Sequence, residues 1–350
     1  MKKSLLALAV LGAYAGVASA QSSVTLYGTV DLSAKYVKND GSERRYSLSQ
    51  DGINSSQLGL KGTEDLGGGL KAGFVLLAGI NADTGSANTQ FWNRRATVSL
   101  WGNFGEVRLG RDYTPTFWNT TIFDAFGTNG LGDSSGVKQL AAPDYVRANN
   151  SIGYFLPSNI GGVYGQAMVA AGEGNNAGRY VGGRVGFAAG PFDVAVSYAQ
   201  ERVVSLGSGN QYKTFNVGGS YDFGVVKLMG YYSQEKIPTN KDKLFSISGV
   251  VPLGQGEIHA GFEQSKLDSN SNKVKKYALG YVYNLSKRTA LYATGAILDN
   301  GSASQATLGS VLPSAANATG DWGGGIGSAT AVPTAGGKSK GFEAGIRHFF

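Results

Sequence analysis

Apolar and polar residues alternate along most of this chain. In residues 24–36, VTLYGTVDLSAKY, the even-numbered positions are mostly apolar and the odd-numbered positions mostly polar. Successive side chains of a β-strand point to opposite faces, so this pattern predicts a strand with one apolar and one polar face. Sixteen such segments are predicted: 24–36, 56–65, 70–80, 91–102, 105–112, 150–157, 162–171, 179–189, 191–201, 211–223, 225–235, 243–252, 256–267, 273–284, 288–298 and 341–350.

The linkers between these segments alternate between short and long. Short ones are glycine turns such as Gly68-Gly69 and Gly254-Gln255. Short-then-long alternation predicts an up-and-down meander with turns at one rim and loops at the other. No helical pattern of 10–15 residues separates the strands, which argues against a parallel sheet. The predicted long linkers are 37–55, 81–90, 113–148, 172–178, 202–210, 236–242, 268–272 and 299–340.

The strand count decides between a soluble sandwich and a membrane barrel. A sandwich would bury the apolar faces against a second sheet and typically has about seven to nine strands. Sixteen antiparallel strands without a domain boundary favour a closed barrel with lipid outside and water inside. The last segment alternates up to Phe350, as expected if the last strand pairs with the first. The predicted fold class is all-β, a 16-stranded antiparallel transmembrane β-barrel.

Residues 113–148 interrupt the strand pattern after the fifth segment. The stretch shows neither strand nor helix periodicity and contains two prolines, four glycines and three acids. Loops of this length are usually functional or disordered. Its aromatic residues, among them Phe117, Trp118 and Phe126, argue against disorder. We therefore expect the stretch to fold and to line a hollow.

Composition narrows the chemistry. The formal net charge is +7, and the chain has no cysteine and two histidines, His259 and His348. Disulfides and cysteine-ligated zinc are therefore excluded, and neither a metal site nor a cofactor is predicted.

The first twenty residues predict a secretory signal peptide. Lys2 and Lys3 precede an apolar run that ends at Ala18-Ser19-Ala20, a small-residue cleavage site. The alternative, a membrane anchor, is disfavoured by this small-residue exit. Residues 21–350 then form the mature barrel, and no later apolar stretch reaches the ~20 residues of a membrane helix.

Several motifs make the resemblance to a known family specific. Together they span the mature chain: Ser23–Gly28 (SVTLYG), Leu58–Gly67 (LGLKGTEDLG), Asn103–Arg111 (NFGEVRLGR), Arg147–Ile152 (RANNSI) and Gly345–Phe350 (GIRHFF). The chain resembles the general, non-specific trimeric outer-membrane porins of Gram-negative bacteria, of the beta-proteobacterial type.

The resemblance implies a homotrimer in the cell outer membrane that passes ions and small hydrophilic solutes by diffusion. It implies that the third long loop, 113–148, folds into the lumen and narrows it. Phe350 resembles the terminal signal for outer-membrane assembly. Lipid and lipopolysaccharide are the implied surroundings, and neither enzymatic activity nor nucleic-acid binding is implied.

The resemblance also implies that basic wall residues face acids of the inserted loop at the constriction. Parity places Val98 outside, hence Arg95 inside and Arg94 outside or at a rim. Arg95 is the first choice within this pair. The full set of wall candidates is Arg95, Arg94, Arg147, Lys61, Arg108 and Gln57. The loop candidates are Asp124, Asp133 and Asp144, with Asp124 preferred as the counter-charge to Arg95 and Lys61.

Two departures from the family pattern bear on selectivity. Related anion-selective porins tend to carry an arginine near Gln57, and an acid would be plausible near Leu77. Loss of both leaves the wall charge similar but weakens the field gradient. The mature net charge of +5, after removal of Lys2 and Lys3, still favours an anion preference.

Three other functions compete. A substrate-specific channel for small organic anions would show saturable block by one solute. A barrel enzyme needs a serine or aspartate beside a histidine at one rim, which two distant histidines disfavour. A structural or adhesive barrel usually has about eight strands and a filled interior.

Overall fold

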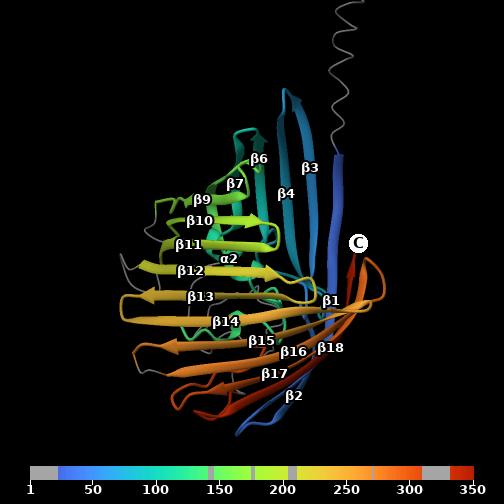
Figure 1. Cartoon of the computed structure of the whole chain (residues 1–350), viewed down its shortest axis with the longest axis vertical. Helices are drawn as coiled ribbons and strands as arrows, with labels where there is room; N and C mark the ends of the chain where they lie inside the picture. The colour runs from blue at the N-terminus through green and yellow to red at the C-terminus, as the bar shows by residue number, and fades with distance from the viewer. Residues whose placement is uncertain (1–22, 141–145, 175–177, 204–210, 270–271, 310–331) are drawn as a thin grey trace, which may run out of the picture.

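The computed structural model describes residues 23–140, 146–174, 178–203, 211–269, 272–309 and 332–350. The predicted signal peptide and the predicted site residue Asp144 lie outside these residues. Within the described part of the chain, no helix is long and apolar enough to cross a membrane. Figure 1 shows the strands wrapped around an interior that contains a short helix.

The strands are β1 (Ser23–Asn39), β2 (Arg44–Gln50), β3 (Gln57–Gly67), β4 (Leu70–Asn81), β5 (Ser86–Ala87), β6 (Arg95–Gly102), β7 (Gly105–Tyr113), β8 (Arg147–Phe155), β9 (Val163–Ala170), β10 (Tyr180–Ala189), β11 (Phe192–Arg202), β12 (Gln211–Asp222), β13 (Lys227–Ile237), β14 (Asn240–Leu253), β15 (Gly256–Leu267), β16 (Lys273–Asn284), β17 (Thr289–Asn300) and β18 (Lys338–Phe349). The helical elements are α2 (Pro115–Ile122) and the 3-10 helix η1 (Ser134–Val137).

The sheet closes on itself through β1. One edge of β1 pairs with β18 over Thr29–Asn39, and the other edge pairs with β3 in its first half and β2 in its second. Strand β5 has two residues and pairs only with β4, as a side hairpin. Strands β2 and β3 together occupy one position in the barrel wall beside β1, so the described strands form a barrel of sixteen strands. The amide of Gly28 donates to the carbonyl of Phe350 at the seam (3.1 Å). The predicted closed barrel is confirmed.

The alternation sorts side chains between the two faces of the wall. On β12, Phe215 and Val217 lie on the outer face, while Thr214 and Asn216 are buried on the inner face. The inner wall is therefore polar and the outer wall apolar, as in a barrel surrounded by lipid.

Two linker predictions are wrong. Residues 44–50, which were predicted to lie in the long linker 37–55, form β2. This strand is short and rich in arginine and serine, so its apolar–polar alternation is weak. The predicted loop 236–242 is a tight turn at Pro238-Thr239, because β13 and β14 continue as charged strands to Ile237 and from Asn240. Strands can continue beyond the hydrocarbon layer with polar side chains, so hydropathy marks the end of the membrane band rather than the end of the strand.

The long loop also contains a helix that periodicity missed. Thr114 caps α2 by accepting a hydrogen bond from the amide of Phe117 (3.3 Å), and Pro115 occupies the first turn. Proline suits this position because its fixed φ matches the helix and because the first turn does not need its missing N–H donor. The helix is eight residues long, which is too short for a clear apolar period.

The loop packs onto the inner wall and makes the largest apolar cluster. Phe123, Leu131 and Val137 of the loop are each at most 1% exposed. Their wall partners in the same cluster include Tyr231, Leu244, Val274 and Leu298. The predicted inward folding of the third long loop is confirmed, and the apolar core of this protein lies inside the barrel between loop and wall.

Candidate functional site

Four charged side chains of β6 and β7 form one ion-pair chain on the inner wall. The guanidinium of Arg108 contacts Asp112 (2.6 Å) and donates two hydrogen bonds to Glu106 (2.9 and 3.0 Å). Arg95 Nε lies 3.4 Å from the other oxygen of Asp112. Such bidentate arginine–carboxylate contacts fix orientation as well as charge. The strand register, which pairs Ser99 with Arg108, places all four on the inner face.

A β-bulge lies beside Asp112, in the pairing of β7 with β8. The register between β7 and β8 shifts between Gly110 and Asp112, and Gly110 has a φ of +125°. A Cβ on Gly110 would lie 2.0 Å from the carbonyl oxygen of Ala96, so the position requires glycine. The extra residue is on β8, where Asn149 and Asn150 together stand opposite Arg111. Arg111 donates to the carbonyl of Asn93 and to the side-chain oxygen of Asn149. Glu106, Arg108 and Asp112 are all even-numbered positions of β7, so ordinary strand alternation places them on one face.

A second basic group surrounds Tyr113, at the entry to the loop. The Arg147 guanidinium lies 4.6 Å above the ring of Tyr113 and donates to its hydroxyl (3.3 Å). Arg94 interacts with the same hydroxyl. Phe117 of α2 stacks with the Tyr113 ring at 5.5 Å between ring centres. The cation–π contact holds Arg147 beside the loop, and the interaction of Arg94 with the same hydroxyl holds Arg94 there.

The predicted outward orientation of Arg94 is wrong. Its side chain is turned inward and its residue is 8% exposed. The reason is that β6 begins at Arg95, so strand parity does not extend to Arg94, which lies in a bend. Both members of the arginine pair therefore lie inside, Arg95 as predicted.

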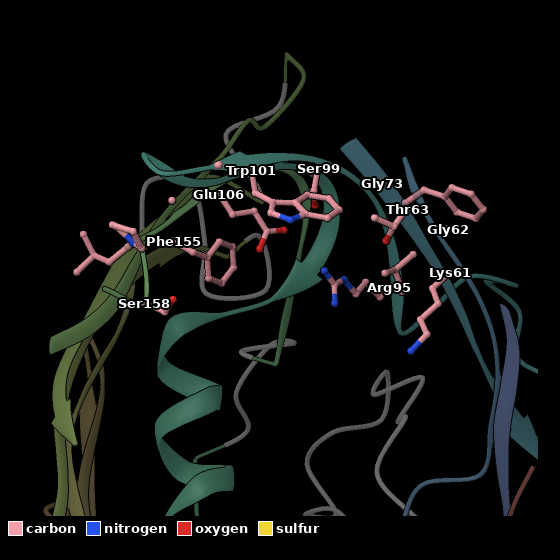
Figure 2. Close-up of a pocket in the computed structure, with 16 residues that line it drawn as sticks. Lys61, Gly62, Thr63, Gly73, Arg95, Ser99, Trp101, Glu106, Phe155 and Ser158 are labelled. Atoms are coloured by element: carbon pink, nitrogen blue, oxygen red, sulfur yellow. The ribbon is translucent and has the colours of Figure 1, made fainter. Parts of the chain in front are cut away.

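Lys61 points into the lumen from β3. Its ammonium lies 5.3 Å from the centre of the Tyr27 ring, and among the described residues it forms no ion pair. Gln57 and Leu77 lie on the same inner face, because Gln57 pairs with Thr29 and Gly79, and Leu77 pairs with Arg95. The two departures from the family pattern therefore lie on the inner wall. Figure 2 shows Lys61 and Arg95 directed into the interior.

The loop acids do not face this basic group. Asp124 is 5% exposed and accepts hydrogen bonds from the amides of Phe126, Thr128 and Ser134 and from the Ser134 hydroxyl. Burial, and next the charge of Asp133, raise the pKa of the Asp124 carboxyl above its usual range. The preference for Asp124 as the counter-charge to Arg95 is thus corrected, because its carboxylate is turned into the loop.

Asp133 is a capping residue of the loop. Its carboxylate accepts from the amide (2.8 Å) and hydroxyl of Ser135 at the start of η1. Its carbonyl oxygen accepts from Lys276 of β16. Asp144 lies outside the described residues. The structure therefore brings together Arg95 and Arg108, and Arg94 and Arg147, but joins neither pair to Asp124 or Asp133.

Charged side chains tie the loop to the wall opposite these arginines. Lys138 pairs with Glu235 of β13, and the amide of Gln139 donates to Asp242 of β14 at 2.5 Å. The side chains of Lys138 and Glu235 are only 8% and 3% exposed, so water and salt screen their attraction little. The loop end is therefore fixed by charge as well as by its apolar cluster.

A third tie involves the barrel seam. The amide of Leu131 donates to Glu343 of β18 (2.7 Å), and Glu343 pairs with Lys35 of β1 at 3.2 Å. Both charged side chains have an exposed fraction of 0%. The same carboxylate thus links the loop to the two strands that close the barrel.

Sequence reasoning missed Asp112 and Glu106, the two acids of the basic wall. Both lie on β7, and Glu106 shares its parity with Arg108. That shared parity was an available signal. Asp112 has the same parity as well, so alternation alone places it on the face of Arg108.

The arrangement can attract and pass anions. Five cationic side chains (Lys61, Arg94, Arg95, Arg108 and Arg147) share the inner wall and loop entry with two carboxylates, Asp112 and Glu106. Fixed charge of one sign in a narrow aqueous space raises the local concentration of the opposite ion. No group of three potential metal ligands occurs among the described residues.

Comparison with known proteins agrees with this geometry. The family model described as Gram-negative porin matches residues 7–303. The chain is 42% identical to outer membrane porin protein 32 of Delftia acidovorans, over 100% of both chains. It is 31% identical to an outer membrane porin protein of Bordetella pertussis, over 86% of this chain and 95% of the relative. The anion-selective porin from Comamonas acidovorans superposes with a TM-score of 0.82 at 37% identity, covering 94% of this chain and 100% of that one.

Proposed function

The chain belongs to the family of Gram-negative porins and forms a channel of the outer membrane, and from that premise we propose that it is a general diffusion channel that prefers anions. Ions and small hydrophilic solutes pass through the water-filled lumen beside the loop. Porins are channels rather than enzymes, and the histidines fit this reading: His259 binds the carbonyl of Ala125 and Glu257, as a loop support.

The excess of basic side chains at the loop entry carries the proposal. We assign the constriction to Arg95, Arg94, Arg147, Lys61 and Arg108, with Gln57 as an uncharged neighbour. Asp112 and Glu106 replace the loop acids as the counter-charges. The selectivity that the Comamonas porin carries in its name supports the same preference for this chain.

A salt-gradient measurement tests the proposal. The purified full-length protein is inserted into a planar bilayer with different KCl concentrations on the two sides. A reversal potential of the sign set by chloride is expected. A reversal potential set by potassium would overturn the anion preference, and saturable block by one organic anion alone would favour the substrate-specific alternative.

We further propose that the chain is exported with a signal peptide at residues 1–20, which is then cleaved, and that the mature channel is a homotrimer. The outer wall has a hollow of about 430 Å³ beside the seam, lined by apolar side chains that include Tyr36, Leu48 and Phe342. A concave apolar surface suits a side chain of a second copy. Mass measurement of the protein–detergent complex would distinguish a trimer from a monomer.

The long-loop rim supports contact with anionic lipid, including lipopolysaccharide. Lysines lie directly opposite one another on adjacent strands: Lys213 and Lys236, Lys236 and Lys241, Lys243 and Lys266, Lys266 and Lys273, and Lys38 and Lys340. Like charges in such positions repel and destabilise the pair. An anionic partner would remove that repulsion.

The position of these lysines fits lipid phosphates. Lys243 is two residues from Phe245 and Lys340 is two residues from Phe342, so each shares the outer face with an aromatic ring. Aromatic girdles mark the interface of a membrane barrel. The lysines therefore lie at the level of the outer-leaflet headgroups, and we propose that they bind phosphate groups there.

A further inference from the structure

A cavity opens to the lumen at the short-turn end of the basic wall. It measures about 380 Å³ and lies between β3, β4, β6, β7 and the segment 155–158. Pockets of about 300–1,000 Å³ are the size that holds small organic molecules. Figure 2 shows Arg95 and Lys61 on one side of this space and Glu106, Trp101 and Phe155 on the other.

Two aromatic side chains of this cavity lie on the inner wall outside the apolar cluster that the loop covers. The register sets Trp101 opposite Glu106 and Glu106 opposite Phe155, so the three stand in one row across β6, β7 and β8. Figure 2 shows both rings directed into the same space. Inward positions of a water-filled barrel are normally polar. Two inward rings at one level therefore offer an apolar surface inside the channel.

Glycine leaves room for the larger ring to lie on the wall. A Cβ on Gly73, the neighbour of Trp101 on β4, would lie 2.7 Å from the indole carbon Cη2. The indole therefore rests on the bare backbone of Gly73 and keeps its other surface towards the cavity. The Phe155 ring is covered by the Arg108 guanidinium at 4.1 Å. Trp101 is thus the ring that can stack with a ligand.

The charges around the cavity favour an anion. Lys61 and Arg95 line it; Arg95 shares the carboxylate of Asp112 with Arg108, and Lys61 has no carboxylate partner among the described residues. Glu106, the acid that also lines it, is bound in bidentate fashion by Arg108, which offsets its charge. The hydroxyls of Thr63, Ser99 and Ser158 can accept or donate hydrogen bonds.

We propose that this cavity is a transient binding site for small aromatic carboxylates, with the ring on Trp101 and the carboxylate towards Arg95 and Lys61. The proposal deepens the anion channel and rests on it, because the anion must enter the lumen first. Planar rings stack on an indole, and carboxylates pair with arginine, so both halves of the ligand have a partner.

Current block in planar bilayers tests the site in the full-length channel. Benzoate is compared with cyclohexanecarboxylate, which has the same charge and similar size but a non-planar ring. We expect a half-blocking concentration about threefold to tenfold lower for benzoate, the range of a stacking contact. Trp101→Leu should remove the difference, and Lys61→Gln should weaken block by both acids. Trp92→Leu, outside the cavity, is the matched control and should keep the difference.

Equal block by the two acids in the unmodified channel overturns the site, and so does an unchanged ratio in Trp101→Leu. Neither result depends on the other, so a Trp101 variant that fails to assemble leaves the comparison in the unmodified channel decisive. The KCl reversal potential is recorded in the same membranes. Potassium selectivity would overturn the proposed function, whereas chloride selectivity with equal block would overturn this site alone.

Discussion

The guanidinium of Arg95 lies 3.4 Å from the carboxylate of Asp112 on the neighbouring strand β7. The counter-charge to Arg95 is therefore on the wall itself. Because Arg108 contacts the other oxygen of Asp112 at 2.6 Å, this one carboxylate binds two guanidinium groups and fixes the position of each. Removing the acid therefore changes the charge of the channel directly.

Asp112→Asn should increase the anion preference. A unit charge about 8 Å from a passing ion in water changes the energy of that ion by ~0.5 kcal/mol. The effect has opposite sign for chloride and potassium, so the permeability ratio should rise about fivefold. Reversal potentials in a KCl gradient measure it, with Asp65→Asn at the exposed end of β3 as the control. An unchanged ratio in Asp112→Asn would place Asp112 away from the ion path.

Arg147→Glu should shift the channel towards cations. The change removes a positive charge and adds a negative one, so the same Coulomb estimate gives a shift of roughly tenfold or more in the permeability ratio. Arg147 is 5% exposed, so Arg147→Gln is measured beside it as the gentler change. Arg179→Glu at the exposed rim should leave the ratio nearly unaltered. If Arg147→Glu behaves like the Arg179 variant, Arg147 is not at the constriction.

Most of the fold follows from alternation alone, because lipid on one side and water on the other impose a period of two. The strand near Phe215 and Asn216 was predictable for that reason. Alternation does not predict the elements that lie outside the boundary between lipid and water. β2 and the turn at Pro238-Thr239 lie at the polar rim, and α2 lies inside the barrel.

The candidate site was predictable only for residues within regular strands. Parity placed Arg95, Arg108 and Lys61 correctly on the inner wall. Parity also places Asp112 on that wall, whereas the local fold of the loop decides where Asp124 points. Local hydrogen bonding fixes the direction of the Asp124 side chain, because the loop has no strand alternation.

Glu343→Gln should destabilise the barrel through Lys35. The substitution leaves a buried ammonium without its carboxylate, which typically costs about 3–5 kcal/mol of unfolding free energy. Lys35→Met in the same chain removes the unpaired charge, so the double variant should lose less than the sum of the two single variants. Unfolding in guanidinium chloride of the detergent-solubilised protein measures each.

The exposed pair Lys338–Asp299, at 3.6 Å, is the matched control for this cycle. Asp299→Asn should change the unfolding free energy by less than about 1 kcal/mol, because surface pairs are screened by water. Additive losses for the Lys35 and Glu343 variants would mean that the two residues do not stabilise each other.

Replacing lysines of the long-loop rim should weaken lipid binding without altering conduction. In the triple variant Lys243→Gln, Lys266→Gln and Lys273→Gln, each substitution removes ~1 kcal/mol of attraction to an anionic surface. We therefore expect about 10- to 100-fold weaker binding of lipid A, measured by titration and native mass spectrometry. The Lys243–Lys266 and Lys266–Lys273 repulsions disappear in the same variant, so the lipid-free protein should be no less stable. Asp268 accepts a hydrogen bond from Lys243 at 2.9 Å and offsets part of the lysine charge. The loss of lipid A binding is therefore expected to reach at least the lower end of the range given above.

The control for the lysine variant carries the same change in net charge at the other rim. Lys71, Lys227 and Lys287 are exposed at the short-turn end, and their replacement by glutamine should leave lipid A binding unchanged. Equal loss of lipid A in both triple variants would mean that net charge alone governs binding, and equal retention would mean that the rim lysines do not contact the phosphates. Only a loss confined to the long-loop rim fits the cross-strand lysine pairs, because repulsion between directly opposed charges is relieved by an anion placed between them.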